Sequence, residues 1–223
     1  MKSKLTWLEA LLVTGPFLAV AVLWNRIPAR IPIHWDLQGE VNGWGSKAFG
    51  TLLLPLISFG LVTLLRVVPR LDPKLRVSLG DHERMRTVLQ ILRLAIAAFC
   101  DVIFCIVIAA ALGYPVAVTR IGLGSSLLLL AILGNYLGNL RPNYFIGIRT
   151  PWTLENPDTW RATHRLGGRL MFFGSLLLLA LQFFLGVSAF GYLFLWSIML
   201  LVVWAFLYSW HHSRTHVKTD PFS

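Results

Sequence analysis

The chain has 223 residues, a formal net charge of +10, 56% hydrophobic residues and only 13% charged residues. Because a soluble domain carries about 25% charged residues, this composition excludes an ordinary soluble protein. The positive charge alone would suit nucleic-acid binding, but the basic residues are distributed in a way that indicates a membrane protein instead.

Six apolar segments of about 20 residues follow one another, each long enough to cross a bilayer as a helix. They cover residues 5–25, 48–69, 88–112, 117–139, 167–187 and 190–210. Two lysines before the first segment resemble the start of a signal peptide. No small-residue cleavage pattern follows, so we interpret the segment as a retained helix, with a cleaved signal as the alternative. The sequence therefore predicts an all-α, polytopic membrane protein with six transmembrane helices.

The basic residues predict the orientation of these helices. Of the 20 lysines and arginines, only Arg26, Arg30, Lys47 and Arg120 fall on one side of the predicted membrane. The others lie at the two ends of the chain and in the second and fourth loops. By the positive-inside rule, both termini and these two loops are cytoplasmic.

The first loop, residues 26–47, interrupts the apolar sequence with prolines, glycines and tryptophans. His34 and Asp36 would share one face of an extended strand and could bind a proton, a metal ion or a peptide amine. Two ligands are too few for a closed zinc site, so no metal site is predicted. Trp35 and Trp44 suit a membrane interface, and Gly39 permits a turn. The alternative is a structured loop whose polar groups satisfy one another.

The fourth loop, residues 140–166, contains a predicted helix start at Asn156 and Pro157. Arg161 and Arg165 would share one face of this helix, and Trp160 and His164 would form a neighbouring face. We interpret the segment as an interfacial helix on the inner leaflet. Its basic face suits either lipid headgroups or docking of an acidic ligand or a cytoplasmic protein.

Two sets of polar residues lie within or at the end of predicted helices. In GNYLGN, at 134–139, Gly134 and Gly138 would let a neighbouring helix approach closely, and Asn135 and Asn139 could hydrogen-bond across it. Asp101 lies well inside the third segment, where a carboxylate usually faces a partner or water. Its candidate partners are Arg93, Arg120 and Gln182. It is either a proton- or ion-coupling group or a neutral packing residue.

Two stretches carry a resemblance to known families. IPIHWDLQGEVNGWGSK, at 31–47, resembles the signature of a membrane domain of unknown function at the start of many bacterial six-span proteins. NYFIGIRTPWTLENPDTWRATHRLGGRLMFFG, at 143–174, resembles the core motif of the SdpI family. The resemblance implies immunity against the secreted sporulation-delaying toxin, or signalling by sequestering a cytoplasmic repressor. It carries over no catalytic residues.

The resulting prediction has two regions: residues 1–87, with the outer loop, and an SdpI-like region, 88–223. The function predicted is a non-enzymatic immunity or signal-transduction protein of the bacterial cytoplasmic membrane, without a cofactor or direct nucleic-acid contact. Its expected partners are membrane lipids, a toxin peptide outside and a repressor inside. The alternative is a small proton- or ion-coupled transporter or channel that uses Asp101. The predicted outer-loop site consists of His34, Trp35, Asp36, Gly39 and Trp44. The predicted motif-loop residues are Asn143, Gly147, Arg149, Thr150, Trp160, Arg161, His164 and Arg165.

Overall fold

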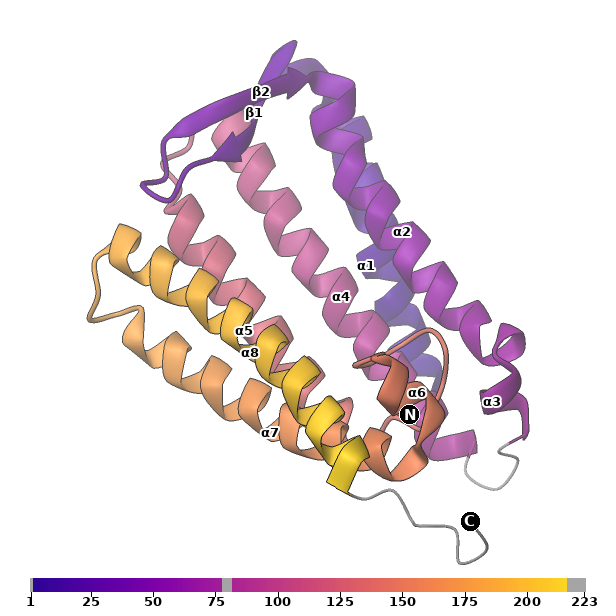
Figure 1. Cartoon of the computed structure of the whole chain (residues 1–223). Coiled ribbons are helices and arrows are strands. Elements are labelled where there is room, and N and C mark those ends of the chain that lie inside the picture. The colour runs from indigo at the N-terminus through magenta and orange to yellow at the C-terminus, as the bar shows by residue number, and fades with distance from the viewer. Residues whose placement is uncertain (1, 78–81, 216–223) are drawn as a thin grey trace, which may run out of the picture.

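The computed structural model describes residues 2–77 and 82–215. Within these ranges, six long helices are apolar enough to span a membrane, which confirms the predicted fold class. They are α1 (Lys2–Leu23), α2 (Lys47–Leu71), α4 (His82–Ala111), α5 (Val118–Leu137), α7 (Pro157–Leu181) and α8 (Val187–Thr215). The start of α1 and the end of α8 lie at the same end of the bundle, as Figure 1 shows. Which side of the membrane this end faces stays a prediction.

Shorter elements lie at the two ends of the bundle (Figure 1). One end carries the 3-10 turn η1 (Trp24–Arg26) and a hairpin of strands β1 (Arg30–Trp35) and β2 (Val41–Ser46). The other end carries α3 (Pro73–Val77) and α6 (Pro151–Glu155). The hairpin adds a small sheet to an otherwise helical chain.

The fifth of the six long helices, α7, begins earlier than predicted. It runs without a break over Pro157–Leu181, so the expectation of a separate interfacial helix followed by a span at 167–187 is wrong. The predicted helix start itself is confirmed, since the Asn156 side chain accepts hydrogen bonds from the backbone N–H groups of Asp158 and Thr159. The arginines lower the apolar character of the first turns, but nothing in those turns ends the helix.

Helices α5 and α7 pack with their backbones in contact. A Cβ atom added to Gly168 would lie 2.7 Å from the Gly134 carbonyl oxygen, and one added to Gly134 would lie 2.8 Å from the Gly168 oxygen. Only glycine fits at such a separation. The predicted close approach at Gly134 is therefore confirmed, and Gly168 supplies its partner surface.

Candidate functional site

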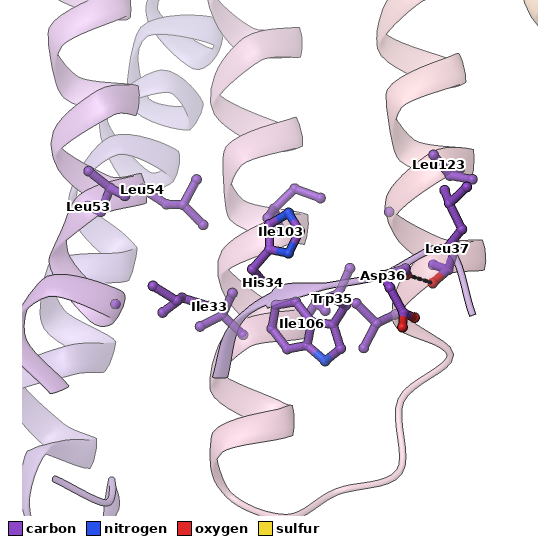
Figure 2. A pocket seen from close by; sticks show the side chains of 15 residues that line it. Ile33, His34, Trp35, Asp36, Leu37, Leu53, Leu54, Ile103, Ile106 and Leu123 are labelled. Carbon is purple, nitrogen blue, oxygen red and sulfur yellow. Dashed lines mark hydrogen bonds between the residues drawn. The ribbon is translucent and has the colours of Figure 1, made fainter. Parts of the chain in front are cut away.

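A cavity of about 380 Å³ lies beneath the hairpin, between α2, α4 and α5. His34 and Trp35, at the end of β1, and Asp36, just after it, line this cavity. Figure 2 shows the His34 ring on one side of the strand and the Trp35 and Asp36 side chains on the other. The remaining walls of the cavity are largely aliphatic, with Leu53 and Leu54 from α2, Ile103 and Ile106 from α4, and Leu123 from α5. An apolar cavity with a few polar groups at one edge suits an amphipathic ligand.

A tight turn ends β1 and gives the hairpin its shape. The Asp36 carboxylate oxygen Oδ1 accepts hydrogen bonds from the backbone N–H groups of Gln38 and Glu40, both at 2.9 Å. Gly39 adopts a φ of +91°, a conformation that a side chain would strain. Asp36 and Gly39 thus shape the turn, and Asp36 also faces the cavity.

The hairpin tip is held across the bundle. The Thr119 hydroxyl of α5 donates to the Asp36 carbonyl oxygen at 3.4 Å, and the Gln38 side-chain amide donates to the Ser188 hydroxyl of α8 at 3.1 Å. At the other end, the Lys47 ammonium group donates to the Trp24 carbonyl oxygen at 2.8 Å. The hairpin therefore bridges helices from both halves of the chain.

His34 and Asp36 do not bind each other. His34 Nδ1 lies 2.5 Å from the Asn42 side-chain oxygen, and the strand pairing is irregular on both sides of His34. His34 and Asp36 were predicted to share one face of an extended strand. Because of this irregularity, the side-chain alternation of an ideal strand does not apply to them. Of the other predicted outer-loop residues, Trp35 lines the cavity, whereas Trp44 is exposed on β2.

At the opposite end of the bundle, the predicted motif loop is folded around buried side chains. Asn143 is 1% exposed. Its amide group donates to the carbonyl oxygens of Arg141 and Ile146, and its Oδ1 accepts from the N–H groups of Phe145 and Ile146. One buried asparagine therefore satisfies four backbone groups of the loop, which is a structural role.

Trp160 and His164 are also buried in this network. Their rings stack with centroids 3.9 Å apart. The Trp160 indole donates to the Leu140 carbonyl oxygen at 2.8 Å, and the Ile148 N–H donates to His164 Nε2 at 3.0 Å. The two rings were expected on one face of the helix, and they are. They hold the loop against α7, so this face of the helix is buried and does not lie on the surface of the inner leaflet, as an interfacial helix would.

Two further predicted residues stabilise the same loop. Gly147 has a φ of +118°, and a side chain there would overlap the His164 ring. The Thr150 hydroxyl caps α6 and donates to the Ser209 hydroxyl of α8 at 2.9 Å.

The predicted arginines lie outside this buried network. Arg161 and Arg165 are exposed, and Arg161 pairs with Asp158. A guanidinium N–H of Arg149 donates to the Tyr144 carbonyl oxygen at 2.7 Å.

The motif loop is joined to the end of α2. Asp72 is fully buried; its Oδ1 accepts from the N–H groups of Lys74 and Leu75, and its Oδ2 accepts from the Tyr144 N–H at 2.6 Å. The Lys74 ammonium group donates to the Leu154 carbonyl oxygen at 2.7 Å. Sequence reasoning missed Asp72, although an acidic residue directly before Pro73 is a helix-start signal.

The intramembrane polar residues divide into two groups. Asp101 contacts neither of its predicted basic partners: Arg93 pairs with Glu9, and Arg120 donates to the Leu185 carbonyl oxygen. Asp101 Oδ1 is buried without a hydrogen-bond partner among the described residues. Asn135 and Asn139 instead line a separate cavity between α5 and α7.

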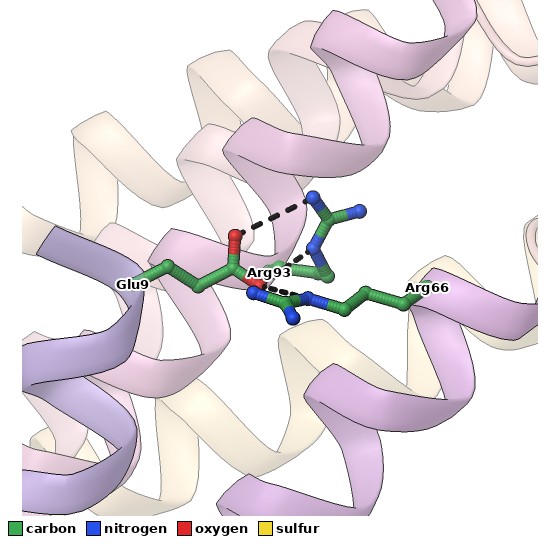
Figure 3. Close-up of polar contacts among 3 residues, drawn as sticks. All are labelled: Glu9, Arg66 and Arg93. Atoms are coloured by element: carbon green, nitrogen blue, oxygen red, sulfur yellow. Dashed lines mark hydrogen bonds and ion pairs between the residues drawn. The ribbon is translucent and has the colours of Figure 1, made fainter. Parts of the chain in front are cut away.

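Sequence reasoning also missed Glu9, which is 1% exposed in α1. Figure 3 shows its carboxylate between Arg66 of α2 and Arg93 of α4. Both Nε atoms lie 2.9 Å from Glu9 Oε1. An acidic residue inside an apolar segment is the signal that could have found this cluster. Among residues 2–77 and 82–215, no group of three or more metal-ligating side chains could hold a metal ion.

Two parts of the chain are similar to known protein families. Residues 139–209 match the SdpI/YfhL protein family, and residues 11–59 match a domain of unknown function, DUF1648. The chain is thus similar to SdpI proteins over its second half. A relative in Bacillus subtilis (strain 168), named immunity protein SdpI, is 27% identical over 183 residues, which is 80% of this chain and 82% of the relative. No solved structure gives a significant match.

These matches and the six apolar helices show a multi-pass protein of the bacterial cytoplasmic membrane. The match to the unknown domain includes the hairpin and much of α1 and α2, and the SdpI match includes the motif loop, α7 and most of α8. The predicted division of the chain between residues 87 and 88 stays a prediction.

Proposed function

We propose that this protein, like the immunity protein to which it is similar, gives immunity, and that it does so by binding a peptide toxin in the cavity beneath the hairpin. Two observations support the proposal: the name of the B. subtilis relative and the apolar cavity of about 380 Å³. The positive-inside rule also predicts that the hairpin lies outside the cell. The cavity is the observation that carries the proposal. It is an apolar site for a membrane-active peptide, and it lies at the end of the bundle that such a peptide is expected to meet first.

The cavity chemistry favours an amphipathic peptide. Its aliphatic walls would bury one or two large apolar side chains, each contributing about 1.5–3 kcal/mol. His34 and Asp36 at the hairpin edge would meet polar groups of the bound peptide. Sequestration of the toxin at this site would keep it from acting on the bilayer.

A chain of contacts from the hairpin to the motif loop supports a relay to the side of the membrane that is predicted to be cytoplasmic. Strand β2 ends at Ser46, which caps α2, and α2 crosses the bundle to Asp72. The Asp72 carboxylate then accepts the Tyr144 N–H of the motif loop. In the relay proposal, a bound toxin shifts the hairpin and α2, and this movement alters the loop surface that a cytoplasmic repressor would contact. The exposed Arg161 is a candidate for that surface.

A matched pair of glycine variants tests toxin binding. Gly122 lines the cavity, and a Cβ atom there meets nothing within 4 Å, as is also true of Gly60 in α2. Gly122→Phe should therefore fill the cavity without disturbing the helices, and Gly60→Phe should place a ring outside it. In a sensitive strain challenged with sporulation-delaying toxin, Gly122→Phe should weaken toxin affinity and protection about 10–100-fold. Equal protection by both variants at equal expression would contradict the cavity as the binding site.

Asp101 favours one second candidate, a proton- or ion-coupled transporter. Its buried Oδ1 without a partner is an expensive feature inside a membrane and is typical of coupling groups. In that case Asp101→Asn would abolish activity, whereas Gly122→Phe would leave it intact. The two variants together therefore separate the two functions.

A further inference from the structure

A second cavity, of about 330 Å³ and with a polar lining, lies between α5 and α7 near the end of the bundle opposite the hairpin. Its polar lining consists of Asn135 from α5, Asn139 just after the end of α5, and Arg165 and Arg169 from α7. The backbone contact between Gly134 and Gly168 closes it on the inner side, and the four polar side chains are exposed. The cavity is therefore a groove that opens on the outer surface of the helix bundle.

The charge in this groove is not balanced within the described part of the chain. No acidic residue lines it. Arg165 and Arg169 make no hydrogen bond or ion pair with a described residue. By contrast, Arg161, one turn before Arg165 on the same helix, pairs with Asp158. Two adjacent guanidinium groups without a carboxylate form a site for an anion with several oxygen atoms, such as a phosphodiester.

The groove is amphipathic along the membrane normal. Arg165 lies about 12 Å along α7 from its start at 1.5 Å per residue. Further along α7, toward the middle of the bilayer, Phe172 and Phe173 complete the lining, and Phe173 is 65% exposed. A polar end with two cations and an apolar end with two aromatic rings matches a phosphate headgroup followed by an acyl chain.

We propose that this groove binds one anionic phospholipid, with its phosphate between Arg165 and Arg169 and an acyl chain along Phe172 and Phe173. The exposed side-chain amide of Asn135 supplies a further hydrogen-bond donor at the headgroup. A lipid is favoured over a free phosphate ester because Phe172 and Phe173 continue the groove as an apolar surface, which a ligand with an acyl chain would contact and a free phosphate ester would not. This lipid site does not depend on the proposed toxin immunity.

The test uses the purified full-length protein in detergent, titrated with phosphatidylglycerol or phosphatidylcholine and followed by native mass spectrometry. We expect preferential binding of one phosphatidylglycerol. Arg165→Gln and Arg169→Gln should each weaken it about fivefold, and the double variant about 25-fold. Arg161→Gln is the matched control and should leave the affinity unchanged. Gly138→Leu, which adds a side chain at the groove edge, should weaken binding without changing the charge.

Each other outcome would overturn the proposal. Equal loss of affinity in Arg161→Gln, Arg165→Gln and Arg169→Gln would show general attraction to a basic surface rather than a site. Complete displacement of the lipid by equimolar glycerol phosphate would show that a free phosphate ester is the ligand. Equal binding of phosphatidylcholine and phosphatidylglycerol would show that the arginines do not select an anionic lipid.

Discussion

Replacement of Glu9 by glutamine tests whether the buried ion cluster holds α1, α2 and α4 together. Glu9 is 1% exposed. Its Oε1 accepts hydrogen bonds from Nε of Arg66 and Nε of Arg93, both at 2.9 Å, and its Oε2 accepts one from Nη2 of Arg93 at 3.4 Å. Glu9→Gln removes the only negative charge of the cluster drawn in Figure 3 and leaves two guanidinium groups side by side.

The expected loss of unfolding free energy in each variant follows from how exposed the replaced side chain is. The Arg93 side chain is 14% exposed and the Arg66 side chain 51% exposed. Removing one partner of a buried ion pair destabilises by about 3–5 kcal/mol, which we expect for Glu9→Gln. Arg93→Gln leaves Glu9 paired with Arg66 and should cost about 1.5–3 kcal/mol. Arg66→Gln removes a half-exposed pair and should cost about 0.2–1 kcal/mol.

Thermal unfolding of the detergent-purified variants, followed by fluorescence-detected size exclusion, measures this order. Glu155→Gln is the matched control because Glu155 is exposed, and it should unfold like the wild type. The double variant Glu9→Gln/Arg93→Met should be more stable than Glu9→Gln, since it removes the buried unpaired charge as well. Equal unfolding temperatures for the Glu9→Gln and Arg66→Gln variants would refute the reasoning.

Three further predictions concern the motif loop and Asp101. Gly147→Ala should lower the unfolding temperature because its side chain would overlap His164, whereas Gly174→Ala meets nothing within 4 Å and should not; no difference between them would contradict the loop packing. Asp72→Asn should preserve toxin binding but reduce signalling to a repressor reporter, because it weakens the bond to the Tyr144 N–H; normal signalling would count against the relay. Asp101→Asn should leave protection intact in a toxin challenge assay, and loss of protection in this variant would favour the transporter.

The six helices were predictable because each apolar segment is long enough to span the bilayer and is interrupted by polar loops. The start of α7 was predicted correctly from Asn156 and Pro157, but the length of that helix was not. The arginines in its first turns suggested a surface helix. In the structure, the opposite side of the same turns is buried through Trp160 and His164, a distinction that local composition does not reveal.

The parts of the site that escaped prediction depend on contacts between distant segments. Glu9 meets Arg66 and Arg93 across separations of 57 and 84 residues, and Asp72 meets Tyr144 across 72 residues. His34, Trp35 and Asp36 were expected to form a site from the outer loop alone. The opposing walls of their cavity come from α2, α4 and α5, and no pattern within the loop specifies which helices these are.

Photo-crosslinking tests the central claim, that a peptide toxin binds beneath the hairpin, most directly. A photoreactive amino acid would replace Leu53 in the cavity wall or Leu177, an exposed residue of α7 outside that wall. Cells expressing each variant would be exposed to labelled sporulation-delaying toxin and irradiated. The account predicts a crosslink from position 53, its loss when Gly122→Phe is added, and none from position 177. Equal crosslinking at both positions, or a position-53 crosslink that survives Gly122→Phe, would contradict it.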